Sequence, residues 1–351
     1  MAASNPLTYR DAGVDIDAQD EALRQAKAAI RSTFTPGVLG DVGAFGGLFD
    51  LGRADCGSGI LVASADGVGT KIAVARRVGR YDTVGRDLVN HCINDILVQG
   101  AKPLFFMDYV GVGRLDPEVV SALIGGCAAS CRENSVALLG GETAEMPGTY
   151  GQGDFDLVGF IVGVVERERL LDGSRVQPGQ VLLGLTSSGL HTNGYSLARR
   201  VLFEELGLEP ESTPAELGGS SVADALLQTH RCYLPLLWPL LERGQIEAMA
   251  HITGGGLPGN VPRVLRDVNA VCDRSSWTPP GLFKLLVEGG ATDHDEAYRV
   301  YNMGIGMVLA VDPSNEAAVR EHLVAAGEEV VAIGRTESGS GTLRWEGECS
   351  F

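Results

Sequence analysis

Apolar and polar residues recur along the first half of the chain with two different periods. A spacing of about 3.6 residues, typical of helices, occurs in three segments: 18–32, 83–99 and 117–133. Between them lie short runs rich in β-branched, leucine or aromatic residues, which predict strands at 59–64, 104–111, 136–139 and 155–165. Helices and strands that follow one another in this way indicate an α/β or α+β fold.

The pattern changes near residue 170, which predicts the end of a first domain. Charged and turn-forming residues occupy 166–179. A second α/β unit follows, with predicted strands at 181–186, near Ala270, at 304–311 and at 329–335, and with a helix that begins at Tyr195. Residues 208–222 are rich in Pro, Ser, Gly and Glu and predict a surface loop. For a chain of 351 residues we therefore expect two α/β domains, 1–170 and 171–351.

Charge and composition restrict the functions that are open to the chain. The 28 basic and 45 acidic residues give a net charge of −17, which argues against nucleic-acid binding. The longest apolar run, 157–165, is too short to span about 30 Å of hydrocarbon, and the first residues lack the features of a signal peptide. Seven scattered cysteines without a CxxC pair are typical of reduced thiols. These features predict a soluble cytoplasmic protein that binds no membrane.

The segment Asp66-Gly67-Val68-Gly69-Thr70-Lys71 follows a predicted strand and opens a predicted helix. Backbone amides at a helix N-terminus and a lysine together attract phosphate, and an aspartate at a strand end can hold Mg²⁺. The segment matches neither of the two common glycine-rich phosphate motifs. From the pattern alone, a tight turn with a solvated lysine explains it equally well.

The predicted helix 83–99 carries a narrow polar arc. Steps of about 100° per residue place Asp87, His91, Asn94 and Asp95 together, while apolar residues cover the rest of the surface. The arc has no Lys or Glu, the long charged residues that usually cover a solvated face. Contact with a ligand or metal and a plain solvated face are both open interpretations.

Two further segments combine glycines with acidic or aromatic residues. Glu142 follows a glycine pair after a predicted strand and is a candidate ligand, although a turn with a capping carboxylate is the simpler interpretation. The glycine-dense segment 40–47, which includes Gly43 and Gly46, is able to fold over phosphates. An ordinary irregular loop accounts for it equally well.

Two segments of the second half have the composition of ligand-binding loops. Residues 187–196 lie between a predicted strand and helix and include His191 and Asn193. Thr253, Gly254, Gly255 and Gly256 precede a helix that we expect to begin at Pro258, so their amides suit a phosphate monoester. A structural histidine and a strained connection are the alternatives.

Taken in order, these segments resemble the aminoimidazole ribonucleotide synthetase family. The similarity covers nearly the whole chain and rests on YRDAGVDID, DGVGTK, HCINDILVQGAKPLFFMDY, GGETAEMPG, GSRVQPGQ, SSGLHTNGYS, HITGGG and PRVL. It implies two α/β domains, of which the first pairs with that of a second subunit in a homodimer through a β-barrel-like sheet, with ATP near the interface. It also implies the reaction, in which ATP activates the formyl oxygen of formylglycinamidine ribonucleotide and an amidine nitrogen then attacks that carbon. The products are aminoimidazole ribonucleotide, ADP and phosphate.

The resemblance also implies roles for individual residues. The implied Mg²⁺ ligands are Asp66, Asp95 and Glu142. The implied ATP-binding residues are Lys27, Gly43, Gly46, Gly67, Gly69, Thr70, Lys71 and Asn94. The implied substrate-binding residues are His191, Asn193, Thr253, Gly254, Gly255 and Gly256. Lys71 and His191 are the candidate catalytic residues, the first as the phosphate contact and the second as the proton carrier.

The sequence departs from the family pattern in one loop and leaves other functions to consider. Asp41 and Ala44 stand where the family usually has glycine, which questions close phosphate approach by that loop. The nearest alternative is a small-molecule kinase of the same superfamily, similar to thiamine monophosphate kinase. A selenophosphate synthetase needs a reactive Cys in 40–47, which is absent, and a hydrogenase-maturation relative needs a terminal Cys, whereas Cys349 is followed by two residues. A nucleotide-binding regulatory module is the alternative from another class.

Overall fold

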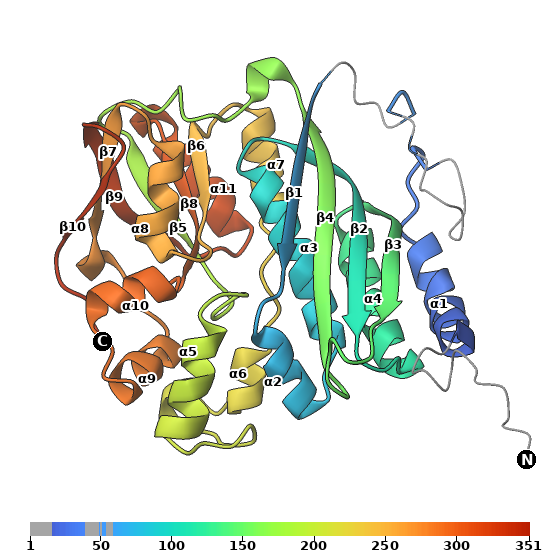
Figure 1. Ribbon diagram of the computed structural model, residues 1–351. Coiled ribbons are helices and arrows are strands. Elements are labelled where there is room, and N and C mark those ends of the chain that lie inside the picture. The colour runs from blue at the N-terminus through green and yellow to red at the C-terminus, as the bar shows by residue number, and fades with distance from the viewer. Residues whose placement is uncertain (1–15, 39–48, 50, 54–58) are drawn as a thin grey trace, which may run out of the picture.

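The structure is a computed structural model that describes residues 16–38, 49, 51–53 and 59–351. It contains two β-sheets, one from each half of the chain, which lie next to each other with helices packed around them (Figure 1). The predicted mixture of helices and strands is confirmed in both halves. The domain limits 1–170 and 171–351 stay a prediction.

The sheet of the first half has four strands in the order β1-β4-β2-β3. They are β1 (Ile60–Gly67), β2 (Lys102–Val112), β3 (Ala137–Glu145) and β4 (Phe155–Val165). β1 and β2 pair antiparallel with β4, whereas β2 and β3 run parallel. The sheet is open at both edges, so the described part of one chain contains no closed barrel. Glu142 lies within β3, and our prediction that it follows the strand was wrong.

Helices cover one face of this sheet (Figure 1). They are α1 (Ile16–Arg31), α3 (Asp82–Leu97) and α4 (Pro117–Glu133), whereas α2 (Lys71–Val78) follows the end of β1 and packs on α3. α4 begins where the Asp116 carboxylate caps the amides of Glu118 and Val119 and where Pro117 takes the first helical position. α3 and α4 can pack closely because residue 126 is a glycine. A Cβ at this position would lie 2.1 Å from the Asp82 carbonyl oxygen, which is too close for any other residue.

The other face of the four-stranded sheet exposes large apolar side chains. Leu61 is 56% exposed, Phe160 is 47% exposed and Met107 is 39% exposed. Phe160 pairs with Met107 of β2 on one side and with Ala65 of β1 on the other, so these residues form a continuous apolar row. A sheet normally buries such a face against another layer.

The sheet of the second half has six strands in the order β10-β7-β9-β5-β8-β6. They are β5 (Val181–Thr186), β6 (Ala248–His251), β7 (Val268–Asp273), β8 (Ile305–Val311), β9 (Val330–Ser338) and β10 (Leu343–Glu346). All seven residues of β8 are buried, which explains its continuous apolar sequence. β6 and β10 were not predicted, because four residues give too short a pattern.

The helices of this half have between 5 and 13 residues. They are α5 (Tyr195–Arg199), α6 (Val222–Leu226), α7 (Leu234–Glu242), α8 (Gly256–Asn260), α9 (Gly281–Gly289), α10 (His294–Val300) and α11 (Pro313–Ala325). α5 continues as a π-helical turn, Arg200–Glu205. The 3₁₀ turns are Arg167–Arg169, Ala215–Leu217, Val261–Val264 and Arg274–Ser276. Within the described ranges, no helix is both long and apolar enough to cross a membrane.

Candidate active site

The polar arc of α3, together with the neighbouring Asn90, binds the backbone of residues 230–233, which belong to the second half. Asp87 Oδ1 accepts a hydrogen bond from the His230 amide at 2.6 Å, and Asn90 Nδ2 donates to the His230 carbonyl at 2.7 Å. Asn94 donates to the Arg231 carbonyl at 2.7 Å and accepts from the Tyr233 amide at 3.0 Å. Much of the arc therefore joins the two halves. The ATP-binding role of Asn94 stays a prediction, and in this structure both of its polar atoms are occupied.

Lys71 is fully buried beneath this contact. Its Nζ lies 2.7 Å from Asp87 Oδ2 and donates to the carbonyl oxygens of Gln228 at 2.6 Å and His191 at 3.2 Å. Burial lowers the pKa of Lys71 and raises that of Asp87, and the attraction between the two groups opposes both shifts. Two of the three ammonium hydrogens therefore go to these carbonyls, and the Asp87 carboxylate balances the charge as an ion pair. The role of Lys71 as the phosphate contact stays a prediction.

Two predicted metal ligands, Asp66 and Asp95, are brought together by His91. His91 Nε2 lies 2.8 Å from Asp66 Oδ2 and 3.4 Å from Asp95 Oδ2. Burial disfavours the charged imidazole, but the two carboxylates raise the pKa of His91 to about 9. Burial also works against the ionised carboxylates, yet hydrogen bonds hold the pKa of Asp66 and of Asp95 below the usual range. The group is therefore an imidazolium between two carboxylates at neutral pH.

Four of the six histidines gather at this point, and we call His91, His191, His230 and His251 the histidine cluster. His251 Nδ1 lies 2.8 Å from Asp95 Oδ1, and its Nε2 lies 3.0 Å from His230 Nε2. The His191 ring stacks on that of His230 with centroids 3.9 Å apart. Burial lowers the pKa of His191, His230 and His251, so these three imidazoles are neutral.

Thr192 completes a ring of polar contacts through the cluster. Its Oγ1 lies 2.7 Å from His91 Nδ1 and 3.4 Å from His230 Nδ1. From His230 the contacts continue to His251 and from His251 to Asp95. Asp95 contacts His91, which completes the ring. Asp95 and His91 come from the first half and the other three members from the second. The orientation of the predicted metal ligand Asp95 therefore depends on contact between the two halves.

The predicted substrate residues surround the same junction. A Cβ placed on Gly254 would lie 3.2 Å from Asn193 Oδ1, and the exposed Thr70 hydroxyl lies 3.0 Å from Ser196 Oγ. Gly69 is also exposed and close to the Thr192 carbonyl. His191 is fully buried and has a φ of 61°. Exposed glycines and hydroxyls thus form the surface, and the histidine cluster lies beneath it.

The three glycines after Thr253 differ in exposure and packing. Gly254 and Gly255 are both exposed. Gly256 is buried, and a Cβ there would lie 1.9 Å from the Tyr298 carbonyl oxygen, so close packing alone requires glycine. α8 begins at Gly256 rather than at Pro258, which corrects our prediction of its start. Thr253, which precedes α8, donates from Oγ1 to Oδ1 of Asn260, the last residue of that helix, at 3.2 Å.

Two predicted ligand residues lie elsewhere. Glu142 of β3 pairs with Tyr109 of β2, and Tyr109 pairs with Val158 of β4. Val158 in turn pairs with Gly67 of β1. Glu142 is thus three strand spacings, or about 14 Å, from the residue next to Asp66. Lys27 lies on α1, which packs on α4 and β3 at that far edge. The structure does not bring either residue to the Asp66–Asp95 pair. Gly43 and Gly46, together with Asp41 and Ala44, lie outside the described residues.

Sequence reasoning did not assign His230 and His251 to the site. His251 ends β6, a strand that the sequence did not reveal, directly before the glycine run. His230 lies in a segment without helical or strand period. The only available signal was the proximity of His251 to the Thr253–Gly256 motif.

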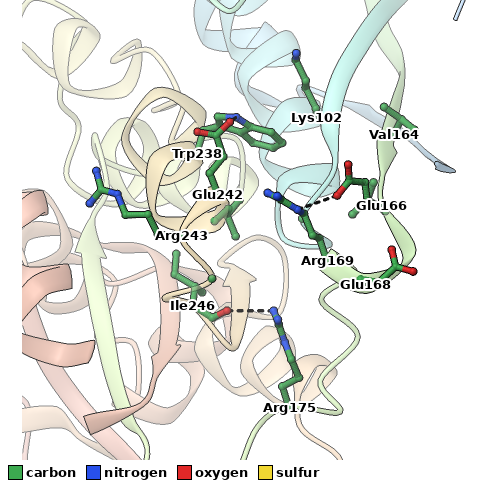
Figure 2. Close-up of a pocket in the computed structure, with 14 residues that line it drawn as sticks. Lys102, Val164, Glu166, Glu168, Arg169, Arg175, Trp238, Glu242, Arg243 and Ile246 are labelled. Carbon is green, nitrogen blue, oxygen red and sulfur yellow. Dashed lines mark hydrogen bonds and ion pairs between the residues drawn. The ribbon is translucent and has the colours of Figure 1, made fainter. Parts of the chain in front are cut away.

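A separate hollow of about 530 Å³ lies between the link to the second half and α7 (Figure 2). Lys102, Arg169 and Glu166 line one side, and Trp238 and Arg243 line the other. Arg169 is paired with Glu166 at 2.9 Å. None of the residues predicted for the site lines this hollow, so the junction around Asp95 is the candidate active site.

Comparison with known proteins agrees with this organisation. The family description "AIR synthase related protein, N-terminal domain" matches residues 52–165, and "AIR synthase related protein, C-terminal domain" matches residues 177–346. A phosphoribosylformylglycinamidine cyclo-ligase from Anaeromyxobacter dehalogenans (strain 2CP-1) is 49% identical over 334 residues, which are 95% of this chain and 96% of that protein.

Two solved structures share the fold. Thiamine-monophosphate kinase from Stenotrophomonas maltophilia K279a superposes with a TM-score of 0.70 at 19% identity, over 94% of this chain and 97% of its own. The hydrogenase maturation protein HypE in complex with ATP superposes with a TM-score of 0.64 at 16% identity, over 96% of this chain and 93% of its own. At these identities the similarity concerns the fold alone.

Proposed function

The chain belongs to the AIR synthase family of phosphoribosylformylglycinamidine cyclo-ligases, and on this basis we propose which residues carry its reaction. The reaction is the ATP-dependent ring closure of formylglycinamidine ribonucleotide to 5-aminoimidazole ribonucleotide, with release of ADP and phosphate, in purine biosynthesis. The formyl oxygen receives the γ-phosphoryl group of ATP, and an amidine nitrogen attacks the activated carbon. The carbon–oxygen bond then breaks and phosphate leaves.

One observation carries the assignment of the site. Segments that are far apart in the sequence meet at a single junction: Asp66–Thr70, Asp87–Asp95, His191–Ser196, Gln228–Tyr233 and His251–Gly255. The junction combines a carboxylate pair, exposed glycines and buried imidazoles. Such a combination suits phosphoryl transfer, in which the protein mainly positions the reactants and stabilises charge.

Asp66 and Asp95 fit Mg²⁺, because carboxylate oxygens are its preferred protein ligands. Asp66 is 45% exposed and Asp95 is 22% exposed, so both are accessible to a hydrated ion. When bound there, Mg²⁺ would neutralise charge on the ATP phosphates. Glu142 lies on the opposite edge strand, so we assign it, with Lys27, to a different part of the nucleotide site.

We assign Lys71 a positioning role in this reaction. Its ammonium holds Asp87 and two carbonyls of the second half, and Asp87 in turn holds the His230 amide. Through these contacts Lys71 fixes the backbone of His191 and His230, two residues of the histidine cluster. Its predicted role as a direct phosphate contact requires these bonds to open when ATP binds.

On the substrate side we assign the amides of the exposed Gly254 and Gly255 to the ribose phosphate and Asn193 to the substrate's polar groups. His191 stays our candidate for the proton carrier. Its imidazole is neutral, and Nδ1 has no hydrogen-bond partner among the described residues, so this edge of the ring is available to a substrate that opens the junction.

We further propose that the uncovered sheet face around Leu61, Met107 and Phe160 is the surface through which two copies form a homodimer. Three large apolar side chains that are 39–56% exposed on neighbouring strands form a patch that monomeric proteins usually avoid. A second copy of the same face supplies an apolar surface of matching chemistry.

The experiment is to measure ADP release by the purified protein with ATP and Mg²⁺, with and without formylglycinamidine ribonucleotide. We expect release to depend on this substrate and to be lost in Asp95→Asn, whereas Asp267→Asn, an exposed carboxylate in the second half, serves as the control. Thiamine monophosphate tests the kinase alternative. ADP release that depends on thiamine monophosphate instead would overturn the proposal.

A further inference from the structure

Arg231 connects the segment Gln228–Tyr233 to the sheet of the second half. Its carbonyl oxygen accepts a hydrogen bond from Asn94 of α3 at 2.7 Å. Its guanidinium contacts the second half instead, where Nη1 donates to Glu328 Oε1 at 3.0 Å and to Thr186 Oγ1 at 3.1 Å, and Nη2 contacts Glu328 Oε2. Thr186 ends β5, and Glu328 lies two residues before β9. One residue thus contacts both the first half and the end of the second sheet.

The Glu328 carboxylate lies in an unfavourable place for a charge. Its side chain is 0% exposed, and that of Arg231 is 35% exposed. Burial raises the pKa of Glu328, and the nearby guanidinium opposes this shift. A buried ion pair often stabilises a fold no more than apolar side chains of similar volume would. The arrangement that the pair holds therefore explains it better than stability does.

His230, the neighbour of Arg231, leads to the predicted metal ligand Asp95. His230 Nε2 lies 3.0 Å from His251 Nε2, and His251 Nδ1 lies 2.8 Å from Asp95 Oδ1. Two polar side chains of α3 hold the His230 backbone on the first half, whereas His251 ends β6 in the second half. The contact between the two rings therefore depends on how the segment around His230 is anchored to the second half.

From these contacts we propose that Arg231 and Glu328 are positioning residues of the reaction. Their pair anchors the segment Gln228–Tyr233 to the second half, so that His230 keeps His251 against the Asp95 carboxylate. The proposal rests on the proposed function for the assignment of Asp95 as a Mg²⁺ ligand. Loss of contacts outside the ligand shell typically lowers metal affinity or activity by about 10- to 100-fold, so the effect of the pair is measurable.

The test variant is Arg231→Met/Glu328→Gln. Methionine keeps much of the apolar stem of the arginine. Glutamine keeps an oxygen that can accept from the Thr186 hydroxyl, now 3.0 Å from Glu328 Oε1, and it leaves no unpaired charge in the interior. Arg335→Met is the matched control, because it breaks an exposed pair with Glu346 on the same sheet. Thermal unfolding shows whether each variant is folded at the assay temperature.

The first measurement is the binding of Mn²⁺ to the full-length protein without nucleotide, followed by the EPR signal of the free ion. Mn²⁺ prefers the same oxygen ligands as Mg²⁺, and Asp95→Asn, which should weaken its binding, identifies the site. We expect the double variant to bind Mn²⁺ about tenfold more weakly than the parent, and the control to bind it equally well. The Mg²⁺ concentration for half-maximal ADP release should rise with it, and saturating Mg²⁺ should restore most of the rate. A loss of activity through poor folding would not respond to Mg²⁺ in this way.

Two more variants test the route through His230. Arg231→Lys keeps a cation beside Glu328 but not the forked guanidinium, and it should weaken Mn²⁺ binding less than the double variant does. His230→Leu removes the contact with His251 and should weaken Mn²⁺ binding by itself. Added to the double variant, it should cause little further loss, because both changes act on the same contact.

Parent-like Mn²⁺ binding in the folded double variant would overturn the proposal, and so would fully additive losses when His230→Leu is combined with it. A change confined to the KM of formylglycinamidine ribonucleotide would overturn it as well, because Arg231 would then contact the substrate. Substrate-dependent ADP release by the parent is a separate result that tests the proposed function. A failure of the positioning role is therefore distinguishable from a failure of that function.

Discussion

The buried pair of Lys71 and Asp87 gives the sharpest prediction about how the junction works. Lys71→Met leaves an aspartate that is fully buried, 0% exposed, without its counter-charge. Breaking a buried ion pair in this way costs about 3–5 kcal/mol. The variant also removes a donor from the Gln228 and His191 carbonyls, at about 1 kcal/mol each. We therefore expect the variant to lose about 5–7 kcal/mol of unfolding free energy.

The double variant Lys71→Met/Asp87→Asn should recover most of this loss. The asparagine carries no charge but keeps an oxygen that accepts the His230 amide, which lies 2.6 Å from Asp87 Oδ1. The cost of the buried unpaired charge, about 3–5 kcal/mol, then disappears. The cost of the two carbonyls that lose their donor, about 2 kcal/mol in total, remains. Arg266→Met is the matched control, because it breaks an exposed pair with Asp172 and should cost less than about 1 kcal/mol.

The assay combines urea unfolding with steady-state kinetics at saturating ATP and Mg²⁺. If Lys71 positions the junction, the double variant recovers stability and a large part of kcat together. A direct phosphate contact predicts a different result, because removing that cation costs roughly a hundredfold or more in kcat whatever happens to stability. A double variant that is as stable as expected but inactive would refute the positioning role.

Three further predictions follow from the same structure. Asp66→Asn and Asp95→Asn should each abolish most turnover while thermal unfolding shows an intact fold, and near-parental activity in both would exclude them as ligands. Phe160→Lys should produce a monomer by sedimentation, whereas Val324→Lys, which replaces a residue 63% exposed on α11, should not; a dimer that survives Phe160→Lys would exclude this face. Burial raises the pKa of Asp108 to about 7, so between about pH 4 and pH 7 the folded state holds a proton that the unfolded state has lost. The free energy of unfolding should therefore fall by up to about 4 kcal/mol as the pH rises through this range. Asp108→Asn should show a smaller fall, and an equal fall in the variant would contradict this assignment.

The sequence predicted the long elements of the first half because their periods are strong. α4 was expected over 117–133 and observed over Pro117–Glu133, and β4 has the bounds expected. The start of β3 was predicted to within one residue, but its end was not, because the strand continues beside β2 through the glycine pair to Glu145. A Cβ at Gly141 would lie 2.0 Å from Asp108 Oδ1, so this glycine serves close strand packing within the sheet.

The site was predicted only in part, because its contacts join residues that are far apart in the sequence. The sequence singled out Asp66, Asp95 and His191, but not that His251, 156 residues after Asp95, orients that carboxylate. It also placed Lys71 in a phosphate motif. Its partners Gln228 and His191 lie 157 and 120 residues away, and no local pattern shows that they occupy the ammonium.

The measurement that tests the central claim most directly is the stoichiometry of the products formed by the purified protein from ATP and formylglycinamidine ribonucleotide. The reaction requires ADP, phosphate and aminoimidazole ribonucleotide in equal amounts, because the phosphoryl group that activates the formyl oxygen leaves when the ring closes. A stable phosphorylated product without free phosphate would identify a kinase and contradict the account.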